Sequence, residues 1–445
     1  MKHLCLSSLL IIASCLVSRA DLVLQRLYTS GTSSNPPTCL VQGNDGNFYG
    51  TFIHESFALG YGTVFRMAPD GSVTSFGFVP GLNDGLALAD DGNFYGTTTN
   101  GGLGYGSILR ISSAGQITTV YSFPASNSAP IGIRAGLDGC LYGACQGTNN
   151  FRFLPRYLNI FRFETNGVLT ILHTTTNAGG LQDVIDLPMQ GADGFLYGSM
   201  SLPQVSPWLI TKPKILFYRL STNGGFQTIY TVTNSPGAAG DLVFGLDGFL
   251  YGVIGDRRTY PAVDGLLFKL STNGVFTTLF SFSGTNGSDP EARLLPASDG
   301  YLYGTTFRGG TAGSGTLFRA STNGALATLV NFEGSTGVNP LADLIQGNDD
   351  NIYGTTRGSQ FSALGTIYRL VQTPAITGLV LTNGSATLTW NSFTDGIYRV
   401  EYKPDLSAPA WTTLIQRVTA TDATISVYDN LPAPDNRLYR IVLLP

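Results

Sequence analysis

Short apolar runs separated by turn-forming residues recur along most of the chain. One stretch contains four in a row: run A at 293–296, run B at 301–306, run C at 316–319 and run D at 326–332. An Asp-Gly pair separates A from B, and Ser-Thr-Asn-Gly separates C from D. Apolar runs of this length between such turns predict antiparallel β-strands joined by hairpins.

The sequence Asp-Gly-Tyr-Leu-Tyr-Gly at 299–304 has six counterparts, and their tyrosines are 46 to 55 residues apart. In a two-residue hairpin turn both central residues take positive φ, which glycine adopts freely and aspartate tolerates. The seventh copy has Asp350 in place of the glycine, a change of modest cost because aspartate can visit the left-handed region. The turn aspartates of the seven units are Asp45, Asp91, Asp138, Asp193, Asp247, Asp299 and Asp349.

Each unit contains the same four runs, with a Tyr-Gly pair in run B. The tyrosine is predicted to pack in the interior, and the glycine to admit a close neighbour. Four antiparallel strands repeated around an axis form the blade of a β-propeller. Closing such sheets into a ring also protects their edges.

The two ends of the repeat region complement each other. Residues 22–29 resemble run D of the fifth unit at 275–281, whereas the seventh unit lacks a run D after its run C at 365–370. We therefore predict an all-β chain in which residues 21–371 form a seven-bladed β-propeller of four-stranded blades, the last blade being closed by the N-terminal strand. An open array of β-hairpins is the alternative.

The segments outside the repeats predict an export signal and a second domain. Residues 1–20 have a basic start, an apolar run and small residues before a cleavage site near Ala20, as in a signal peptide. Ile12–Cys15 also resembles a lipobox, in which Cys15 would be lipidated. Residues 375–445 contain alternating apolar runs and predict a small β-sandwich.

Composition narrows the classes of function. Charged residues make up 12% of the chain and the net charge is −4, so the basic surface of a nucleic-acid-binding protein is not expected. No transmembrane helix is expected in the mature chain. Cys39, Cys140 and Cys145 follow no metal-ligand spacing, and we expect free thiols, no metal, no cofactor and a monomer.

The repeated Asp-Gly-x-(Leu/Phe)-Tyr-Gly motif, followed in several units by Thr-Thr and Gly-Gly, resembles the GloVer-type tandem repeats of exported bacterial proteins. The closest matches are at 97–102 and 305–310. The resemblance implies a propeller-like exported protein and supplies no catalytic residues. Trp390 and the Tyr398-x-Val400-x-Tyr402 pattern resemble fibronectin type III-like modules.

Loops between runs B and C vary between units and are the first candidates for ligand contacts. Exposed aromatic residues and arginines suit stacking on a sugar or anchoring a protein partner. The alternative is that these aromatic residues pack within their own loops. The ligand-binding candidates are Phe151, Arg152, Arg156, Tyr157, Trp208, Arg257, Arg258 and Tyr260.

Charged residues at the start of the A runs form a second candidate set, expected to ring the mouth of the central channel with mostly negative charge. They are Asp84, Asp186, Asp241, Arg293 and Asp343. The alternative is a set of solvated strand starts. The turn aspartates lie one to a unit and cannot converge on a metal ion, so we assign them to turn formation.

Catalysis has little support, because the mature chain has only His54 and His173 and no catalytic motif. The leading hypothesis is an exported, non-catalytic binding or scaffold protein, secreted or at the cell surface or periplasm. Its B–C and inter-blade loops would engage a glycan or an extracellular protein. The alternatives are an extracellular carbohydrate-active enzyme using the channel-mouth carboxylates, and a purely structural envelope protein.

Overall fold

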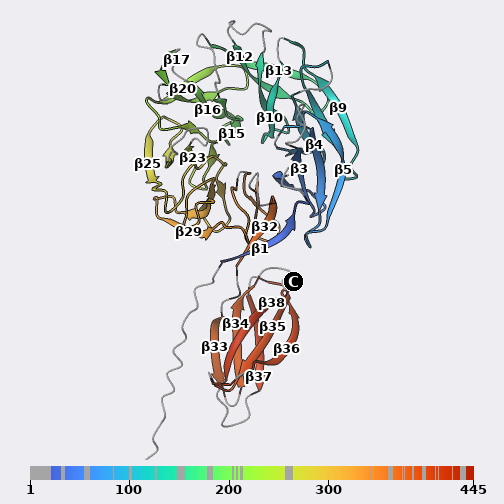
Figure 1. Cartoon of the computed structure of the whole chain (residues 1–445), viewed down its shortest axis with the longest axis vertical. Helices are drawn as coiled ribbons and strands as arrows, with labels where there is room; N and C mark the ends of the chain where they lie inside the picture. Colours follow the sequence, from blue (N-terminus) through green and yellow to red (C-terminus); the bar gives the residue numbers. More distant parts are fainter. Residues whose placement is uncertain are drawn as a thin grey trace, which may run out of the picture. The chain divides into compact units, whose positions relative to one another are not determined.

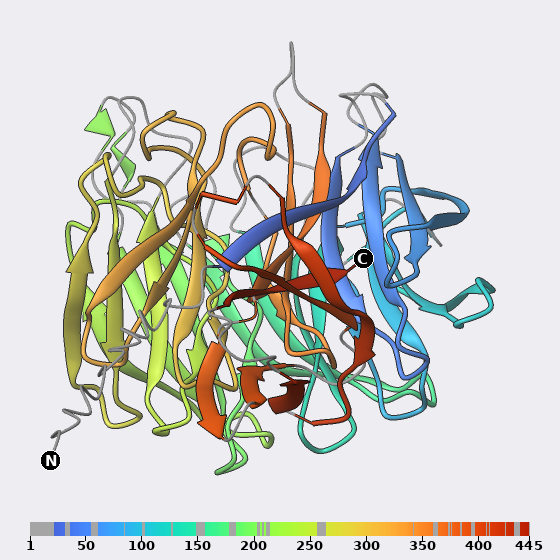
Figure 2. The ribbon, with the colours of Figure 1, turned by 90° about the horizontal axis from the view of Figure 1, so that it is seen from below.

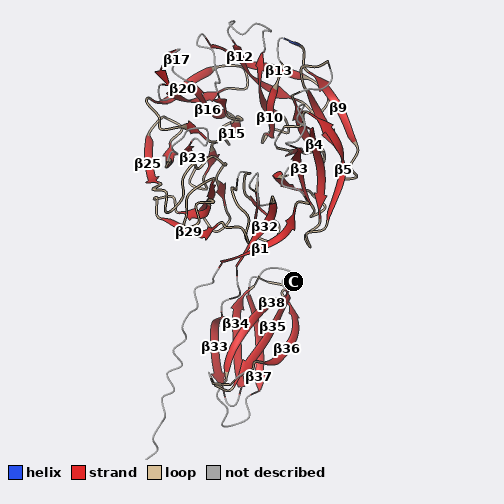
Figure 3. Ribbon diagram, viewed as in Figure 1, coloured by secondary structure: helices blue, strands red, loops and turns tan. Residues whose placement is uncertain are grey.

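The computed structural model is built of strands and turns, and its described part contains no α-helix; the short blue segment in Figure 3 is a 3-10 turn at Ala125. Leu24–Arg369 form one compact unit, and residues from Leu370 onward belong to a second. No helix in the described part is long and apolar enough to cross a membrane. The described residues are 22–31, 36–54, 61–83, 85–99, 103–125, 128–147, 156–177, 184–202, 205–206, 209–210, 214–255, 264–340, 342–358, 364–372, 374, 376–382, 385–392, 397–405, 407–408, 410–422, 424–430 and 437–444.

The larger unit is built from antiparallel sheets that follow one another along the chain. The first three sheets are formed by β2 (Pro37–Gln42), β3 (Phe48–His54), β4 (Tyr61–Met67) and β5 (Val73–Pro80); β6 (Ala87–Leu88), β7 (Phe94–Thr98), β8 (Ser107–Ile111) and β9 (Ile117–Ser122); and β10 (Pro130–Ala135), β11 (Leu141–Gly147), β12 (Arg156–Phe163) and β13 (Leu169–Asn177).

In the fourth and fifth sheets the first strand is split into two short pieces. The fourth contains β14 (Val184–Ile185), β15 (Met189–Gln190), β16 (Leu196–Leu202), β19 (Lys214–Leu220) and β20 (Phe226–Val232), beside the hairpin β17 (Val205–Ser206) and β18 (Leu209–Ile210). The fifth contains β21 (Ala238–Ala239), β22 (Val243–Phe244), β23 (Leu250–Gly255), β24 (Leu266–Leu270) and β25 (Phe276–Ser281).

The sixth sheet contains β26 (Leu295–Pro296), β27 (Leu302–Thr306), β28 (Thr316–Ala320) and β29 (Leu326–Asn331). Another has the order β1-β32-β31-β30, from β1 (Leu22–Thr29), β32 (Thr366–Gln372), β31 (Ile352–Thr356) and β30 (Ile345–Gln346). Figure 1 shows these sheets side by side around a common centre, with β5, β9, β13 and β25 at the outer edge. Figure 2, a view at right angles, shows the strands running between the two faces of this ring.

The first and last strands of the repeat region lie next to each other. The N–H of Ser30 donates to the carbonyl of Gly365 at 2.9 Å. Leu27 packs against a buried cluster that includes Ile367 and Tyr353. A strand from the N-terminal end of the repeats therefore shares a sheet and a core with their C-terminal end.

The Asp-Gly turns are three-residue loops, so the predicted two-residue turn was wrong. In the first unit the N–H of Gly43 donates to the carbonyl of Asn47 at 2.8 Å, and that of Gly46 to Gly43 at 3.0 Å. Gly46 has a φ of 79°, whereas Asp45 does not have positive φ. This is a type I turn followed by a left-handed residue. The same pair of hydrogen bonds begins at Ala89, Gly191, Gly245, Ala297 and Gly347 in other units.

The aspartate occupies the right-handed position before the glycine in this turn, and its side chain bonds to two residues that follow it. Asp45 Oδ1 accepts the N–H of Asn47 at 3.1 Å, and Oδ2 accepts the hydroxyl of Tyr49 at 2.8 Å. In the seventh unit Asp350 occupies the left-handed position with a φ of 60°, as predicted. The tyrosine-to-aspartate bond has a length of 2.7 to 2.8 Å in all units: Tyr49–Asp45, Tyr95–Asp91, Tyr142–Asp138, Tyr197–Asp193, Tyr251–Asp247, Tyr303–Asp299 and Tyr353–Asp349.

The glycine after the tyrosine is crossed by an aromatic ring in six of the seven units, and in the second unit a Cβ on Gly96 would instead lie 3.0 Å from Leu86. A Cβ on Gly252 would lie 2.6 Å from Cζ of Phe268, and one on Gly304 would lie 2.5 Å from Cζ of Phe318. Both phenylalanines are fully buried and directly oppose their glycines in the sheet. The prediction that this glycine admits a close neighbour is confirmed.

The smaller unit consists of two three-stranded antiparallel sheets. Trp390, Tyr398 and Val400 are buried in a core shared by both sheets, and the rings of Trp390 and Tyr398 meet edge to face at 5.8 Å. The first sheet contains β33 (Ile376–Thr382), β34 (Ser385–Asn391) and β37 (Thr424–Asn430); the second contains β36 (Thr412–Thr419), β35 (Ile397–Lys403) and β38 (Leu438–Leu444).

Candidate functional site

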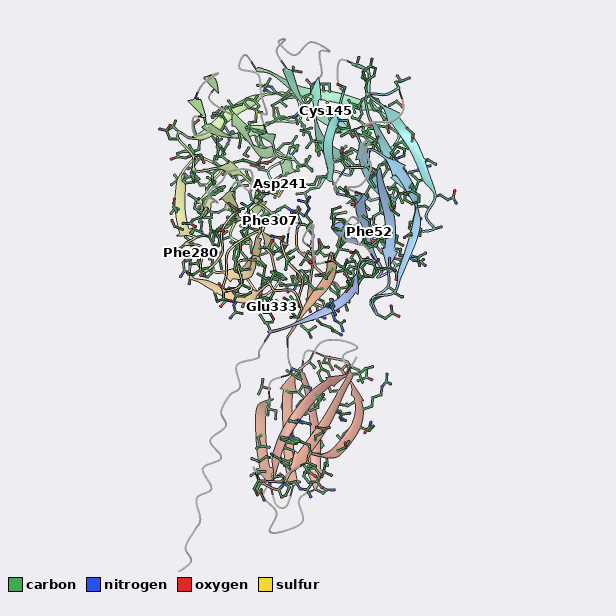
Figure 4. All side chains as sticks on the ribbon, in the orientation of Figure 1. Phe52, Cys145, Asp241, Phe280, Phe307 and Glu333 are labelled. Carbon is green, nitrogen blue, oxygen red and sulfur yellow. The ribbon has the colours of Figure 1, made fainter. Side chains whose placement is uncertain are left out.

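Breaks in the inner strands place acidic side chains at the inner side of the ring. Asp186 lies between β14 and β15, and Asp241 lies between β21 and β22. Arg293 and Asp343 precede the short strands β26 and β30 in the same way. Figure 4 shows Asp241 toward the middle of the ring and Phe280 at its outer rim.

Arg134 of β10 connects the third, fourth and fifth sheets. Its Nη2 forms an ion pair with Oδ2 of Asp241, and its Nη1 donates to the carbonyl of Leu187 at 3.1 Å. The N–H of Leu187 donates to Oδ1 of Asp241 at 3.2 Å. The side chains of Arg134 and Asp241 keep 13% and 21% of their surface exposed, so this ion pair is still in contact with solvent.

Asp186 lies deeper, beside this pair. Its carboxyl accepts a hydrogen bond from the hydroxyl of Ser199 on β16. Burial raises the pKa of Asp186 well above its ordinary value, and the negative charge of Asp241 raises it further. Asp186 is therefore harder to ionise than an exposed aspartate, and it lies beside the ion pair between Arg134 and Asp241.

The hydroxyl of Tyr218 is directed at the same place. Tyr218 is fully buried on β19, its ring crosses Gly198, and its hydroxyl has no hydrogen-bond partner in the described part of the chain. Burial raises its pKa, and the charges of Asp186 and Asp241 add to the effect. Buried hydroxyl groups normally have a partner, so this one needs an explanation.

A second ion pair continues the cluster. Arg293 Nε lies 3.1 Å from Asp343 Oδ2, and the Arg293 N–H donates to Asp343 Oδ1 at 2.9 Å. Burial and the nearby charge of Arg134 lower the pKa of Arg293, so the two guanidinium groups act on each other. We call Arg134, Asp186, Asp241, Arg293 and Asp343 the central cluster.

Four of the five channel-mouth candidates thus interact as one cluster, and the fifth, Asp84, lies outside the described residues. Arg134 lessens the expected excess of negative charge, because with Arg293 it faces three aspartates. Arg156 and Tyr157 belong to β12, but their side chains are not described. The other loop candidates also lie outside the described residues: Phe151, Arg152, Trp208, Arg257, Arg258 and Tyr260.

Arg134, Ser199 and Tyr218 were not among the residues predicted from the sequence. Tyr218 has a detectable signal, because the repeat has phenylalanine at the same place in other units, for example Phe268 and Phe318, each opposite its glycine. No signal in the sequence identifies Arg134. It lies nearer to the turn aspartate of its unit than Asp186, Asp241, Arg293 and Asp343 lie to theirs, and it reaches the cluster only through its side chain.

The repeated aspartates, histidines and thiols form no comparable group. In the described part of the chain no three His, Cys, Asp or Glu side chains are placed to hold a metal ion. His173 stacks on Phe226 at 4.0 Å on the outer strands, and the side chain of His54 is not described. Cys39, Cys140 and Cys145 form no disulfide bond within the described residues, and burial raises the pKa of Cys145 to about 12.

Known structures share the fold of the repeat region. A catalytically inactive virginiamycin B lyase from Staphylococcus aureus, crystallised with quinupristin, matches with a TM-score of 0.55 at 17% identity, over 79% of this chain and all of that one. The polysaccharide lyase Uly1 matches with a TM-score of 0.50 at 9% identity, over 78% of this chain and 93% of that one. At these identities the likeness concerns the propeller-like fold alone.

Sequence comparison adds the nature of the repeat. No curated protein matches the chain. The model of the Gloeobacter/Verrucomicrobia repeat family matches residues 238–392, which contain the fifth, sixth and seventh copies of the motif. This part of the chain therefore carries the Gloeobacter/Verrucomicrobia repeat, in sheets arranged like those of a β-propeller.

Proposed function

We propose that residues 21–371 form a seven-bladed β-propeller whose last blade is completed by β1. Two contacts that recur between successive units support closure, since both also join the seventh unit to the first. The N–H of Ser298 donates to Gln346 Oε1 of the next unit at 2.9 Å, and the N–H of Asn348 donates to Gln42 Oε1 at 2.8 Å.

The second recurring contact involves the glycine of the C–D turn. A Cβ on Gly324 would lie 2.6 Å from the carbonyl oxygen of Leu279, in the outer strand of the preceding unit. Gly71 of the first unit has the same relation to Leu27 of β1, also at 2.6 Å. In this contact β1 takes the place of an outer strand of the seventh unit.

We propose further that this is an exported binding or scaffold protein, which engages a glycan or an extracellular protein through the face that carries the B–C and inter-blade loops. Cleavage near Ala20, or lipidation of Cys15, would release or anchor it, and the fibronectin type III-like unit would serve attachment. The observation that carries this proposal is the convergence of five charged residues from five successive sheets. Their ion pairs hold polar groups in fixed positions at the inner side of the ring, as a binding site requires.

The test is binding of the mature chain to a glycan array and to extracellular protein extracts, followed by the Asp241→Asn and Asp343→Asn variants. We expect a glycan or protein ligand whose affinity falls when the cluster or the B–C loops are changed. The absence of any ligand would contradict the proposal and leave a purely structural role.

A carbohydrate-active enzyme is the second candidate, and one observation favours it. Glycoside hydrolysis uses one protonated and one ionised carboxyl group. Burial raises the pKa of Asp186, and Asp186 lies beside Asp241, which is ion-paired with Arg134. Release of reducing sugar from polysaccharides, abolished in Asp186→Asn, would support this function. Binding without turnover would support the first.

A further inference from the structure

We propose that the two ion pairs of the central cluster bind a neutral polyhydroxylated ring, such as an uncharged sugar residue, with Asp186 and Tyr218 behind them as the groups that set the hydrogen-bonding pattern. This inference rests on the proposed binding function and names the class of its ligand. It depends on which hydrogen-bonding positions the cluster leaves open.

The charges of the cluster are already balanced. Asp241 is paired with Arg134, and Asp343 is paired with Arg293. Asp186 forms no ion pair within the described residues and is only 8% exposed, and this burial disfavours its charged form. An anionic or cationic ligand would have to compete with an existing ion pair, which is unfavourable where the groups are partly desolvated.

Hydroxyl groups do not face this competition, because the ion pairs keep unused donors and acceptors. Arg134 uses one N–H for Asp241 and one for Leu187, and a guanidinium has further N–H groups in its plane. Each oxygen of Asp241 accepts a single bond within the described part of the chain, and a carboxylate oxygen can accept more. Adjacent hydroxyls of a sugar can donate to the carboxylate and accept from the guanidinium together.

Exposure decides which groups touch the ligand. The side chains of Arg293 and Asp343 keep 29% and 40% of their surface, more than those of Arg134 and Asp241. Asp186 keeps 8% and Tyr218 none. A ligand therefore contacts the ion pairs directly and reaches Asp186 at most with one hydroxyl, whereas Tyr218 acts through Asp186 as a positioning residue.

The hydroxyl of Tyr218 gives independent support for a ligand-directed arrangement. Four other units have phenylalanine here, namely Phe65, Phe161, Phe268 and Phe318, and need no hydroxyl to cover their glycine. The seventh unit has Tyr368, whose hydroxyl is also buried without a partner in the described part of the chain, but there burial alone raises the pKa. In the fourth unit the hydroxyl of Tyr218 is buried without a partner and interacts electrostatically with Asp186, Asp241 and Arg134. The cost of such a group is offset if it keeps the proton of Asp186 in place for a hydroxyl acceptor.

Isothermal titration calorimetry on the full mature chain tests this inference. The probes are neutral hexasaccharides (cellohexaose, mannohexaose and xylohexaose), the acidic hexagalacturonate and the cationic chitosan hexamer. We expect at least one neutral probe to bind and both charged probes to bind at least tenfold more weakly. Asp241→Asn and Asp343→Asn should weaken neutral binding tenfold or more, whereas Glu164→Gln, which breaks an ion pair outside the cluster (Arg162–Glu164), should not change it.

Tyr218→Phe separates positioning from folding, because four other units carry phenylalanine at this place. We expect an unchanged melting temperature and a few-fold weaker affinity for the neutral probe. As the pH is raised and Asp186 loses its proton, the affinity of the variant should begin to fall at a lower pH than that of the parent chain. Three outcomes would overturn the inference: a charged probe binds more tightly than the neutral ones, no neutral probe binds, or the cluster variants leave the binding of the neutral probe unchanged. In the last case the proposed binding function would stand, whereas a chain that binds no glycan or protein would contradict both.

Discussion

The guanidinium Nε of Arg369 donates a hydrogen bond of 2.7 Å to Oε1 of Gln25, a residue 344 positions earlier in the chain. Arg369 lies on β32 and Gln25 on β1, which are neighbours in one sheet. Without β1, strand β32 would present an open edge, and exposed edges promote association between chains. The N-terminal strand is thus part of the structure of the last repeat.

Removal of residues 22–29 tests this role. Leu27 and Tyr28 would leave a buried cluster, and burying a large apolar side chain contributes about 2 kcal/mol. We expect unfolding in urea to require at least about 3 kcal/mol less free energy, with oligomers in size-exclusion chromatography. A chain that lacks only residues 1–21 serves as the control, and equal stability of the two chains would contradict closure by β1.

The repeat made most of this fold predictable. The spacing of the tyrosines indicated one sheet per unit, and the unmatched run at 22–29 indicated which strand joins the last sheet. The turn geometry was not predictable from the Asp-Gly pair alone. The decisive interactions are the hydrogen bonds from Asn47 and Tyr49 to the Asp45 carboxylate. A rule for two-residue turns considers only the two central residues, so it does not take account of Tyr49, which lies four residues after Asp45.

The candidate site was predictable only in part. Counting back from the turn aspartates identified Asp186, Asp241, Arg293 and Asp343, because the repeat fixes which positions lie at the start of an inner strand. It did not identify their partners. Arg134 reaches Asp241 across two unit boundaries, and such a contact depends on the ring and not on local sequence.

The hydrogen bond between Tyr303 and Asp299 allows a measurement of how much the repeated motif contributes to the free energy of unfolding. Tyr303 is 4% exposed, burial raises its pKa to about 12, and its hydroxyl lies 2.8 Å from the carboxylate. We expect Tyr303→Phe to lower the free energy of unfolding by about 1.5 kcal/mol, as for a hydrogen bond to a charged group. Tyr301→Phe, at a 38% exposed ring in the same unit, is the control and should change it little.

Asp299→Ala should cost more than Tyr303→Phe, because it leaves a buried hydroxyl without a partner and also removes the acceptor of the Tyr301 N–H. In the Tyr303→Phe background the same change should cost less. Urea titrations of the four proteins give the coupling between the two residues. Additive effects would show that the bond contributes nothing to stability.

Asp350 provides a stabilising substitution. It holds a φ of 60°, where other units have glycine, for example Gly300 with a φ of 82°. A residue with a side chain in this region costs roughly 1 kcal/mol. We expect Asp350→Gly to raise the free energy of unfolding by up to that amount and Gly300→Asp to lower it similarly. Thermal unfolding of both variants checks this, and a destabilised Asp350→Gly would mean that the bond from Gln346 Nε2 to Oδ1 of Asp350 outweighs the backbone strain.

The pH dependence of the melting temperature distinguishes Asp186 from an ordinary surface carboxyl group. Because burial raises its pKa in the folded chain, the folded state holds this proton over a pH range in which the unfolded state has released it. Stability therefore falls as pH rises from the ordinary aspartate pKa, about 4, to the raised one. Asp186→Asn removes this loss, so its melting temperature should fall less between pH 4 and pH 8 than that of the parent chain.

Asp70 supplies a control of opposite sign. It is exposed, and its bonds to the hydroxyl and N–H of Ser72 lower its pKa. Its contribution to stability is therefore present above the ordinary aspartate pKa and is lost as pH falls through the lowered one. Asp70→Asn should reduce the gain in melting temperature as the pH rises from the lowered pKa of Asp70 to the ordinary one, whereas Asp186→Asn should reduce the fall in melting temperature above the ordinary one. If both variants shift the pH profile in the same direction, Asp186 is ionised in the folded chain, and the neutral charge balance on which the central cluster depends would be wrong.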